Sequence, residues 1–428
     1  MATFSAALRQ VKEHLEQSLP QEFICQSCAE IGYRWRKRFL DPALTIQLLV
    51  LQLLAKVALR GLRRAANVSV TAQAICAARM RLPVELFTRL VERTVPENLA
   101  GAVYRQFKTY IVDGMGFMTA DTPLLAGKFG KSRNQRGKGN GYPTPKLLAL
   151  MQAGGGFIGR SIILPYARQE FTCLARLFKA MDPASLLLGD RGLVSFTHMA
   201  LLMAQGFHGC FRLPRWQVVF NRGKGSRRLK KRLGKQDALV TWSASSRPKW
   251  LSKKRWALIA DQTLALRQIS FRVCRKGFRT HWAWIIVTLL DPKEFPAQEL
   301  IDLYSQRWQI EVHFRDLKRT LGMHMISART IQGVQKEVLA FILLYNLIHK
   351  VMVEAARRQG VPPDRISFVD AMLWLLYSAP GTPQPKLEVN RCRTRRTQPR
   401  RLKNARHRFP QLNQPRSELC KPPCVAKI

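Results

Sequence analysis

The chain has 428 residues, with 71 Lys and Arg against 27 Asp and Glu, so its formal net charge is +44. Hydrophobic residues make up 46% of the sequence, which excludes a disordered protein and is enough to build more than one core. So large a positive charge favours a polyanion as the partner, and nucleic acid is the first candidate.

The most apolar stretch, residues 44–59, contains Gln47, Gln52 and Lys56. It is shorter than the roughly 20 apolar residues that cross a bilayer, so we expect a buried helix and no membrane partner. The first residues do not form a basic segment followed by an apolar one, which argues against secretion. We therefore expect a cytoplasmic protein.

The nine cysteines are odd in number and scattered along the chain, as in proteins of reducing compartments. Two close pairs, Cys25 with Cys28 and Cys420 with Cys424, could each supply half of a zinc site. A structural zinc ion needs four convergent ligands, and neither pair has a second pair or a histidine cluster nearby in sequence. Ordinary free thiols are the favoured interpretation.

Residues 1–104 carry the apolar periodicity of helices and no good strand pattern. The periodicity predicts helices over three segments, 4–15, 44–62 and 70–91. The last segment is broken near Leu82 and Pro83, with Arg79 and Arg81 at the break. This pattern fits a helix-turn-helix that contacts DNA and a plain helical hairpin equally well. We expect a helical DNA-binding domain over 1–104.

Strands and helices alternate after Lys108. TYIVDG and SLLLGDRG are apolar runs that end in Asp113 and Asp190; KLLALM and FIGRSIIL are further strand-like runs, and FTCLARLFKAM has a helical pattern. A buried strand that ends in a carboxylate holds that group rigidly at the tip of a sheet. One such aspartate usually forms a turn or a helix cap, but two of them indicate a site.

A β-rich insertion with a basic loop is expected over about 212–290. RLPRWQVVFNRGKGSRRLKKRLGK supplies the basic loop, around Arg227 to Arg232, and LRQISFRVC and HWAWIIVTLL read as strands. From about residue 380 the chain is rich in Pro, Arg and Lys. This basic C-terminal tail would repel itself and should order only on a polyanion.

In YSQRWQIEVHFRDLKRTLG, residues 304–322, four polar side chains recur at helical spacing: Tyr304, Arg307, Glu311 and Lys318. One continuous α-helix would hold them within an arc of about 60°. Apolar residues form a second stripe that should face the core: Leu303, Ile310, Phe314, Leu317 and Leu321. The simplest alternative is a surface ion pair between Arg307 and Glu311, with a solvated Lys318.

Three carboxylates near one sheet, Asp113, Asp190 and Glu311, suit two Mg²⁺ or Mn²⁺ ions, which prefer oxygen ligands. Two such ions promote phosphodiester displacement without a nucleophilic side chain. Arg307 could then bind a phosphate through its planar fork, while Lys318 neutralises a second one.

The spacing Tyr304-x2-Arg307-x3-Glu311-x6-Lys318 resembles the signature of bacterial insertion-sequence DDE transposases with the Tyr-Arg-Glu-Lys motif, the family founded on insertion sequence four. The resemblance extends to DGMGFMTADTPLLAGKFG, to GDRG, to LLDPKEFPAQELIDLYSQRWQIE and to PRRLKNARHRFP. It covers roughly residues 105–410.

This resemblance implies an RNase H-like α/β core, a mixed five-stranded sheet flanked by helices with a β-rich insertion before the glutamate. It implies that Asp113, Asp190 and Glu311 are the catalytic, metal-binding triad. Asp121 competes with Asp113 for the first position, but it lies in a loop away from the apolar TYIV run, and the family pattern favours the aspartate before the glycine.

The resemblance also implies roles in DNA binding. Tyr304, Arg307 and Lys318 correspond to DNA-contacting positions of the motif. In relatives with a hairpin intermediate, a tryptophan of the insertion stacks on a flipped base, and Trp282 or Trp284 could do so here. The more ordinary interpretation of Trp282 and Trp284 is a pair of core or cross-strand aromatics.

We therefore expect a DDE transposase that binds the double-stranded ends of its element as a homodimer, cleaves there with two Mg²⁺ or Mn²⁺ ions and joins the ends to target DNA. The alternatives are an inactive or domesticated DNA-binding relative and an RNA-associated basic protein. The expected catalytic domain spans 105–355, and the C-terminal region with the basic tail spans 356–428.

Overall fold

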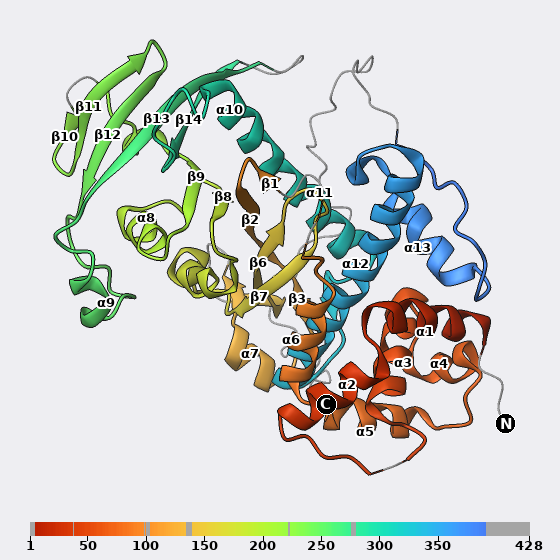
Figure 1. Cartoon of the computed structure of the whole chain (residues 1–428). Coiled ribbons are helices and arrows are strands. Elements are labelled where there is room, and N and C mark those ends of the chain that lie inside the picture. Colours follow the sequence, from red (N-terminus) through yellow and green to blue (C-terminus); the bar gives the residue numbers. More distant parts are fainter. Residues whose placement is uncertain are drawn as a thin grey trace, which may run out of the picture.

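The computed structural model of the protein describes residues 5–36, 38–97, 99, 103–133, 139–220, 223–274 and 280–390. The expected basic tail, with Cys420 and Cys424, lies outside the described residues apart from its first part. In Figure 1 the N-terminal helices and a large sheet lie on opposite sides of one long helix, α12.

Six helices form the N-terminal part, in agreement with the predicted helical character: α1 (Ala6–Ser18), α2 (Gln21–Glu30), α3 (Pro42–Leu54), α4 (Leu59–Ala66), α5 (Ala72–Arg81) and α6 (Val84–Arg93). Side-chain caps begin several of them, as where Asp41 accepts a hydrogen bond from the Leu44 N–H at 2.7 Å. The apolar stretch 44–59 forms a buried helix, as predicted, only as far as Leu54, and the single helix expected over 44–62 is two helices, α3 and α4, which meet at a bend of 107°.

The α5–α6 pair breaks at Leu82 and Pro83, as predicted. One face of α6 is buried, and α6 packs on α12. On its outer side, Arg89 forms ion pairs with Glu30 and Glu85. A helix that reads DNA must present an unpaired polar face to the groove, so this packing favours the plain hairpin over a helix-turn-helix with α6 as the reading helix.

One continuous sheet of eleven strands follows. Its first part has five strands: β2 (Phe107–Gly116), β6 (Lys146–Gln152), β7 (Ile158–Leu164), β8 (Ser185–Gly189) and β9 (His208–Arg212). Their spatial order is β7-β6-β2-β8-β9. The β7–β6 and β6–β2 pairs are antiparallel, whereas β8 pairs with β2, and β9 with β8, in parallel.

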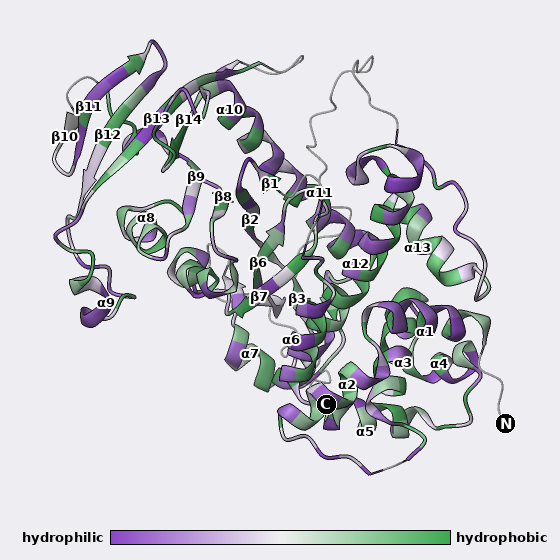
Figure 2. Cartoon of the chain, viewed as in Figure 1, coloured by the Kyte–Doolittle hydropathy of each residue, from purple (hydrophilic) through white to green (hydrophobic). Residues whose placement is uncertain are grey.

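The β-rich insertion extends this same sheet, so the expectation of a five-stranded sheet was too small. Its strands are β10 (Gly223–Lys224), β11 (Arg227–Gly234), β12 (Asp237–Ser243), β13 (Thr263–Val273) and β14 (His281–Val287). β14 pairs with β9 in antiparallel fashion and joins the two parts. The expected basic loop around Arg227 to Arg232 is also strand: it forms β11, which is largely hydrophilic in Figure 2.

The remaining elements cover the sheet or lie at its ends. The helices are α7 (Pro123–Phe129), α8 (Phe196–Met203), α9 (Lys253–Ala257), α10 (Ala297–Ser305), α11 (Gln309–Arg315), α12 (Ile331–Gln359) and α13 (Phe368–Tyr377). Short strands pair beside them: β1 (Val103–Tyr104) with β2, β3 (Met118–Thr119) with β15 (Met325–Ile326), and β4 (Lys131–Arg133) with β5 (Gly139–Pro143). The segment FTCLARLFKAM, expected as an α-helix, forms two 3₁₀-helices, η1 (Glu170–Arg176) and η2 (Phe178–Ala180).

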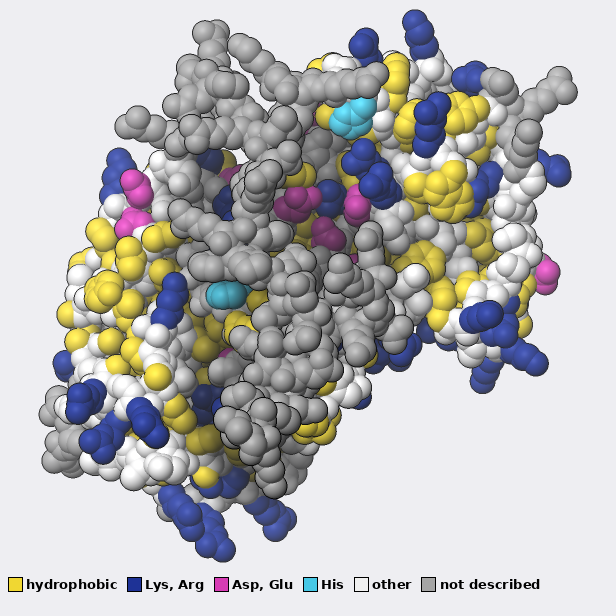
Figure 3. All heavy atoms as spheres, turned by 180° about the vertical axis from the view of Figure 1, so that it is seen from behind, with side chains coloured by type: hydrophobic (Ala, Val, Ile, Leu, Met, Phe, Trp, Pro, Cys, Tyr) yellow, Lys and Arg dark blue, Asp and Glu magenta, His cyan; other side chains and the backbone are white. Residues whose placement is uncertain are grey.

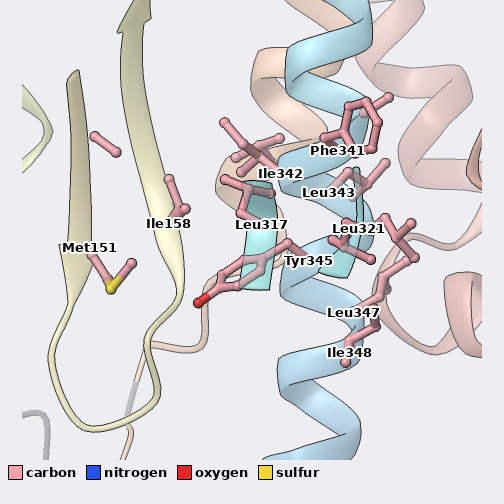
Figure 4. Close-up of a cluster of buried hydrophobic side chains, with 14 of the residues drawn as sticks. Met151, Ile158, Leu317, Leu321, Phe341, Ile342, Leu343, Tyr345, Leu347 and Ile348 are labelled. Carbon is pink, nitrogen blue, oxygen red and sulfur yellow. The ribbon is translucent and has the colours of Figure 1, made fainter. Parts of the chain in front are cut away.

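Two hydrophobic cores lie on the two faces of the sheet. One contains α8 and the 3₁₀-helices, and the other contains α11, α12 and the N-terminal helices. Figure 4 shows α12 side chains between the strands and the other helices, with Tyr345 directed to the strands. By length and composition α12 could cross a membrane, but 78% of its most apolar window is buried inside the protein, which is typical of a core helix.

The helix expected over 304–322 is not uniform. Four segments follow one another: the end of α10, a 3₁₀ turn η4 (Gln306–Trp308), α11 and a π-helical turn η5 (Asp316–Thr320). Because 3₁₀ and π turns have different angles per residue, Lys318 does not keep the phase that a continuous α-helix would give it. The predicted apolar stripe is nevertheless buried throughout: Leu303, Ile310, Phe314, Leu317 and Leu321.

Lys336 of α12 ties the N-terminal hairpin to the rest of the molecule. Lys336 is only 6% exposed. Its ammonium donates to the carbonyls of Arg79, Met80 and Leu82 at 2.9, 2.9 and 3.0 Å. These carbonyls end α5 and would otherwise lack partners, so Lys336 serves as a remote C-terminal cap. Burial, and to a lesser extent Arg79, lower the pKa of Lys336.

We predict that Lys336→Met lowers the free energy of unfolding by about 2 kcal/mol, because it removes charge-assisted hydrogen bonds and leaves buried carbonyls unpaired. Urea denaturation measures this change. The control is Lys12→Met, whose partner Glu16 lies at 3.6 Å on the surface and whose loss should cost less than about 0.5 kcal/mol. Equal stability of the two variants would contradict the capping role.

Candidate active site

Two aspartates project from neighbouring strand ends toward the same face of the sheet. Asp113 lies in β2 between Ile111 and Met115, which belong to the core that contains α11. Asp190 directly follows β8, two residues after Leu188 of that same core. Because side chains alternate along a strand, Asp113 and Asp190 share the face of these neighbours. β2 and β8 are paired in parallel, so both carboxylates lie near the same end of the sheet.

Arg307 joins this strand end to the helical run above it. Its guanidinium donates to Asp113 Oδ2 at 3.2 Å and to Glu311 Oε1 at 3.3 Å. Arg307 is only 8% exposed, whereas the Glu311 side chain is 42% exposed. The contact to Glu311 is the expected i, i+4 pair, but the bridge to Asp113 spans 194 residues and makes the pair part of a buried cluster.

Electrostatic interactions link Arg307 with all three carboxylates. Burial acts to lower the Arg307 pKa, but Tyr304, Asp190, Asp113 and Glu311 together raise it. Asp190 therefore belongs to the same cluster, although its carboxylate makes no hydrogen bond within the described part of the chain. The structure thus brings Asp113, Asp190 and Glu311 together around one cation.

Burial raises the pKa of Asp113 to about 6. The Gly114 N–H, at 2.8 Å from Asp113 Oδ1, and the Arg307 guanidinium act in the opposite direction, while the charges of Asp190 and Glu170 raise the pKa further. A carboxyl group with a strongly raised pKa beside other carboxylates is typical of functional sites. The group would release its proton when further positive charge binds nearby.

Tyr304 lies under the cluster rather than on an exposed face. It is 8% exposed, and its hydroxyl has no hydrogen-bond partner among the described residues. Burial raises the pKa of Tyr304, with smaller contributions from Asp190 and Cys210 in the same direction. A buried, unpaired hydroxyl is costly, so a polar ligand that reached it would gain a hydrogen bond.

Lys318 and Asp121 lie apart from this cluster. Lys318 is partly exposed in the π-helical turn, and its ammonium has no ion-pair or hydrogen-bond partner in the residues that the structure describes. Asp121 pairs with Lys131 at 2.7 Å in the loop before α7. This engagement agrees with the choice of Asp113 rather than Asp121 as the strand-end carboxylate.

The donor chemistry fits hard divalent cations, since Asp113, Asp190 and Glu311 offer carboxylate oxygens near Arg307 and the Tyr304 hydroxyl is a further oxygen. Over the described ranges, however, no three His, Cys, Asp or Glu side chains are already arranged around a common point as metal ligands. The Arg307 guanidinium contacts the Asp113 and Glu311 carboxylates and neutralises them. Cys25 and Cys28 are free thiols, and burial raises the Cys28 pKa to about 11.

Trp282 and Trp284 of β14 line a cavity of about 720 Å³. Trp282 is 45% exposed, lies opposite Arg272 of β13 and has the Arg272 guanidinium 5.9 Å from its ring centre. Trp284 packs against the core that contains α8 and meets Phe220 edge to face at 6.1 Å. Arg191, Arg212 and Arg215 line the same cavity. The interpretation as core or cross-strand aromatics thus agrees with part of the surroundings of both residues, and the cavity adds a second, open side.

Sequence reasoning missed two contributions to this region. Glu170, at the start of η1, has its carboxylate so close to Gly114 that a Cβ there would lie 2.3 to 2.6 Å from its atoms. A side chain at position 114 would force the Glu170 carboxylate to move, and the Glu170 charge raises the pKa of Asp113. Arg191 could have been noticed, because it directly follows Asp190 in the sequence; no local pattern singles out Glu170. In Figure 3 several acidic side chains gather near the middle of one face, with Lys and Arg around the rim.

Comparison with known proteins agrees with this geometry. The chain is 27% identical to the transposase InsG for insertion sequence element IS4 of Escherichia coli over 308 residues, 71% of this chain and 66% of that protein. It is 29% identical to the putative transposase InsZ of Escherichia coli over 151 residues, 34% of this chain and 50% of that protein. The matched segments thus cover just under two thirds of InsG and half of InsZ.

A solved structure, the cryo-EM structure of the piggyBac transposase synaptic complex with hairpin DNA, aligns with 85% of this chain and 78% of its own at 9% identity and a TM-score of 0.43. The family model described as "Transposase DDE domain" matches residues 105–347. This range includes Asp113, Asp190, Glu311 and all five strands of the first part of the sheet. Since the match covers more than half of the chain, the protein belongs to the family of transposases with a DDE domain.

Proposed function

We propose that the protein binds the ends of an insertion sequence, cleaves DNA there by metal-dependent phosphodiester hydrolysis and joins the 3′-hydroxyl ends to target DNA. The observation that carries the proposal is the Arg307-centred cluster of Asp113, Asp190 and Glu311 at one end of the sheet. This arrangement combines acceptors for hard cations with a buried guanidinium that suits phosphate, which are the two requirements of phosphodiester chemistry.

The strand order supports an RNase H-like catalytic core. Three antiparallel strands, β7-β6-β2, continue into two strands parallel to β2, and the first aspartate lies on the central β2. We propose that this core spans residues 105–355, with the insertion at about 212–290 between β9 and α10. The helical N-terminal region, 1–104, and the basic tail of the C-terminal region, 356–428, would then bind DNA outside the catalytic core.

In the proposed mechanism Asp113, Asp190 and Glu311 hold two Mg²⁺ or Mn²⁺ ions. When bound, the ions would activate the attacking oxygen and stabilise the leaving oxygen of an in-line displacement. Arg307 would release its carboxylates and bind a phosphate beside the scissile bond through two parallel hydrogen bonds. The Tyr304 hydroxyl would donate to the same strand, and Lys318 would neutralise a neighbouring phosphate.

The Trp282 and Trp284 cavity fits a base that has left the duplex. Its aromatic rings offer stacking surfaces, and Arg191, Arg212 and Arg215 surround it with positive charge. A net charge of +44 further supports double-stranded DNA as the main partner. We propose a homodimer on DNA, as cleavage and joining of two ends requires two active sites, and a cytoplasmic location with access to the bacterial chromosome.

Single alanine substitutions of the triad provide the first test. Asp113→Ala, Asp190→Ala and Glu311→Ala should each abolish Mg²⁺-dependent cleavage of an end-containing duplex, because each removes a metal ligand. DNA affinity should change by a few-fold at most, because carboxylates oppose rather than support phosphate binding. Asp121→Ala, outside the cluster, is the matched control and should cleave normally. Cleavage by the Asp113 variant would refute the site assignment, and an inactive wild-type protein that binds DNA would favour the inactive relative.

Arg307 and Lys318 need a separate test. If they hold the phosphates near the scissile bond, Arg307→Ala should lower the rate about a hundredfold or more, since small displacements of the phosphate remove the in-line geometry. Arg307→Lys keeps the charge without the planar fork and should remain strongly impaired; Lys318→Ala should show a smaller loss. Arg89→Ala, a surface ion-pair residue of α6, serves as the control. Thermal melting checks that the Arg307 and Lys318 variants are folded. If folded variants cleave at normal rates, Arg307 only forms an ion pair with Glu311, and Lys318 is only solvated.

The raised pKa of Asp113 predicts a pH dependence with a defined sign. Below about pH 6 the Asp113 carboxyl is protonated in the metal-free protein, and above it the group is ionised and ready to accept a cation. Cleavage at limiting Mn²⁺ should therefore rise as the pH increases through about 6. More Mn²⁺ should move the midpoint to lower pH, because the ion competes with the proton. A midpoint that does not depend on Mn²⁺ would show that another group controls the profile.

A further inference from the structure

A second cavity of about 780 Å³ lies beside the one that contains Trp282 and Trp284. Arg191 and Arg215 line both cavities, so the two cavities are neighbours. Arg191 directly follows Asp190 in the sequence, which places both cavities near that carboxylate. The second cavity lies between the segment that holds Phe171, next to Glu170, and the start of the insertion. Asp113, Asp190 and Glu311 do not line this second cavity, and the proposed cleavage chemistry does not use it.

The lining combines aromatic rings with positive charge. Five aromatic residues line the cavity: Phe171, Phe196, Trp216, Trp242 and Trp256. Three cations accompany them, Arg191, Arg215 and Arg227, together with several serines, and no Asp or Glu is among the described residues that line it. Aromatic platforms next to cations without counter-charges are the usual means by which proteins bind unpaired nucleic acid.

Among these lining residues, Trp216 gives the clearest indication of a stacking site. It lies on the 3₁₀-helix η3 (Arg215–Gln217) and is 73% exposed, although large aromatic side chains are normally at least half buried. The Arg227 guanidinium lies 5.3 Å from the Trp216 ring centre and 5.1 Å from that of Trp242. One side of this platform is therefore held by a cation, which leaves the exposed ring as a stacking surface.

Arg227 makes no ion pair within the described part of the chain. Burial lowers its pKa, so its charge has been partly removed from water without a carboxylate to compensate. The charge of Arg227 should therefore favour the binding of an anionic ligand in this cavity.

We propose that this second cavity binds an unpaired nucleotide of a DNA strand, with its base stacked on Trp216 and its phosphate held by Arg191 and Arg215. The choice of DNA rests on the proposed function, while the preference for an unpaired nucleotide rests on the geometry of the cavity. A base within a duplex is already stacked on both faces and cannot use Trp216. The position next to Asp190 suits a strand that leaves the active site.

The test measures the affinity of the full-length protein for a short fluorescent single strand of mixed sequence and for the matching duplex, by anisotropy in EDTA, where no cleavage occurs. Trp216→Ala should weaken single-strand binding by about fivefold or more, the effect of losing one base stack, and should change duplex affinity less than about twofold. Trp216→Phe keeps an aromatic surface and should recover most of the loss. Arg215→Gln should also weaken single-strand binding, with a reduced dependence on salt.

Tyr377→Ala is the matched control, because Tyr377 is an equally exposed aromatic residue, at 77%, on the distant helix α13. It should leave both affinities unchanged, and thermal melting should show all variants folded. Unchanged single-strand affinity in Trp216→Ala would overturn the inference, and so would an equal loss for single strand and duplex, which would indicate a plain duplex contact. Triad variants that still cleave DNA would instead refute the proposed active site and leave this result standing.

Discussion

The cluster around Arg307 is the interaction on which the geometry of the site depends. Asp113 and Glu311 come from a strand and a helix far apart in sequence, and the same guanidinium donates to both at 3.2 and 3.3 Å. With Asp190 nearby, three carboxylates would repel one another in a partly buried space. A cation with two donor edges offsets this repulsion, so Arg307 keeps the helix over the sheet end while metal ions are absent. Metal ions would take over this role and free the arginine for phosphate.

The scaffold beneath the cluster explains why the carboxylates face one another at all. β2 and β8 are adjacent and parallel, with Val112 paired with Gly189, so Asp113 and Asp190 follow directly at the same level, and the alternation of side chains turns them toward α11. On the other face of β2, the Glu170 carboxylate lies close to Gly114, which has no side chain. A strand of the central sheet therefore has carboxylates on both sides of one position. Burial raises the pKa of Asp113, the charges of Asp190 and Glu170 raise it further, and the site therefore responds to added positive charge.

Local patterns in the sequence predicted the elements well, because apolar runs and helical spacing depend only on neighbouring residues. The strands that carry Asp113 and precede Asp190 are where they were expected, although β2 continues beyond Asp113 to Gly116, and the buried stripe from Leu303 to Leu321 is confirmed. The departures arise where long-range packing decides. Docking of the helix on the sheet produces the Arg307 bridge to Asp113 and the π-helical turn at Lys318. Pairing between β9 and β14 extends the sheet, and the size of the sheet cannot be predicted from any single segment.

The insertion gains its importance from this continuity of the sheet. Since β14 pairs with β9, and β9 with β8, the strand that ends at Asp190 is rigidly connected to Trp282 and Trp284. Aromatic residues exposed at the surface, such as Trp216 and Trp282, do not contribute to the core and expose costly apolar area to water. Their retention beside arginines is understandable if they bind bases whose phosphates those arginines neutralise. A hydrogen-bonded sheet keeps such surfaces at a fixed distance from the carboxylates, which a flexible loop could not do. The same sheet that positions Asp113 and Asp190 would then also determine the path of the bound DNA strand.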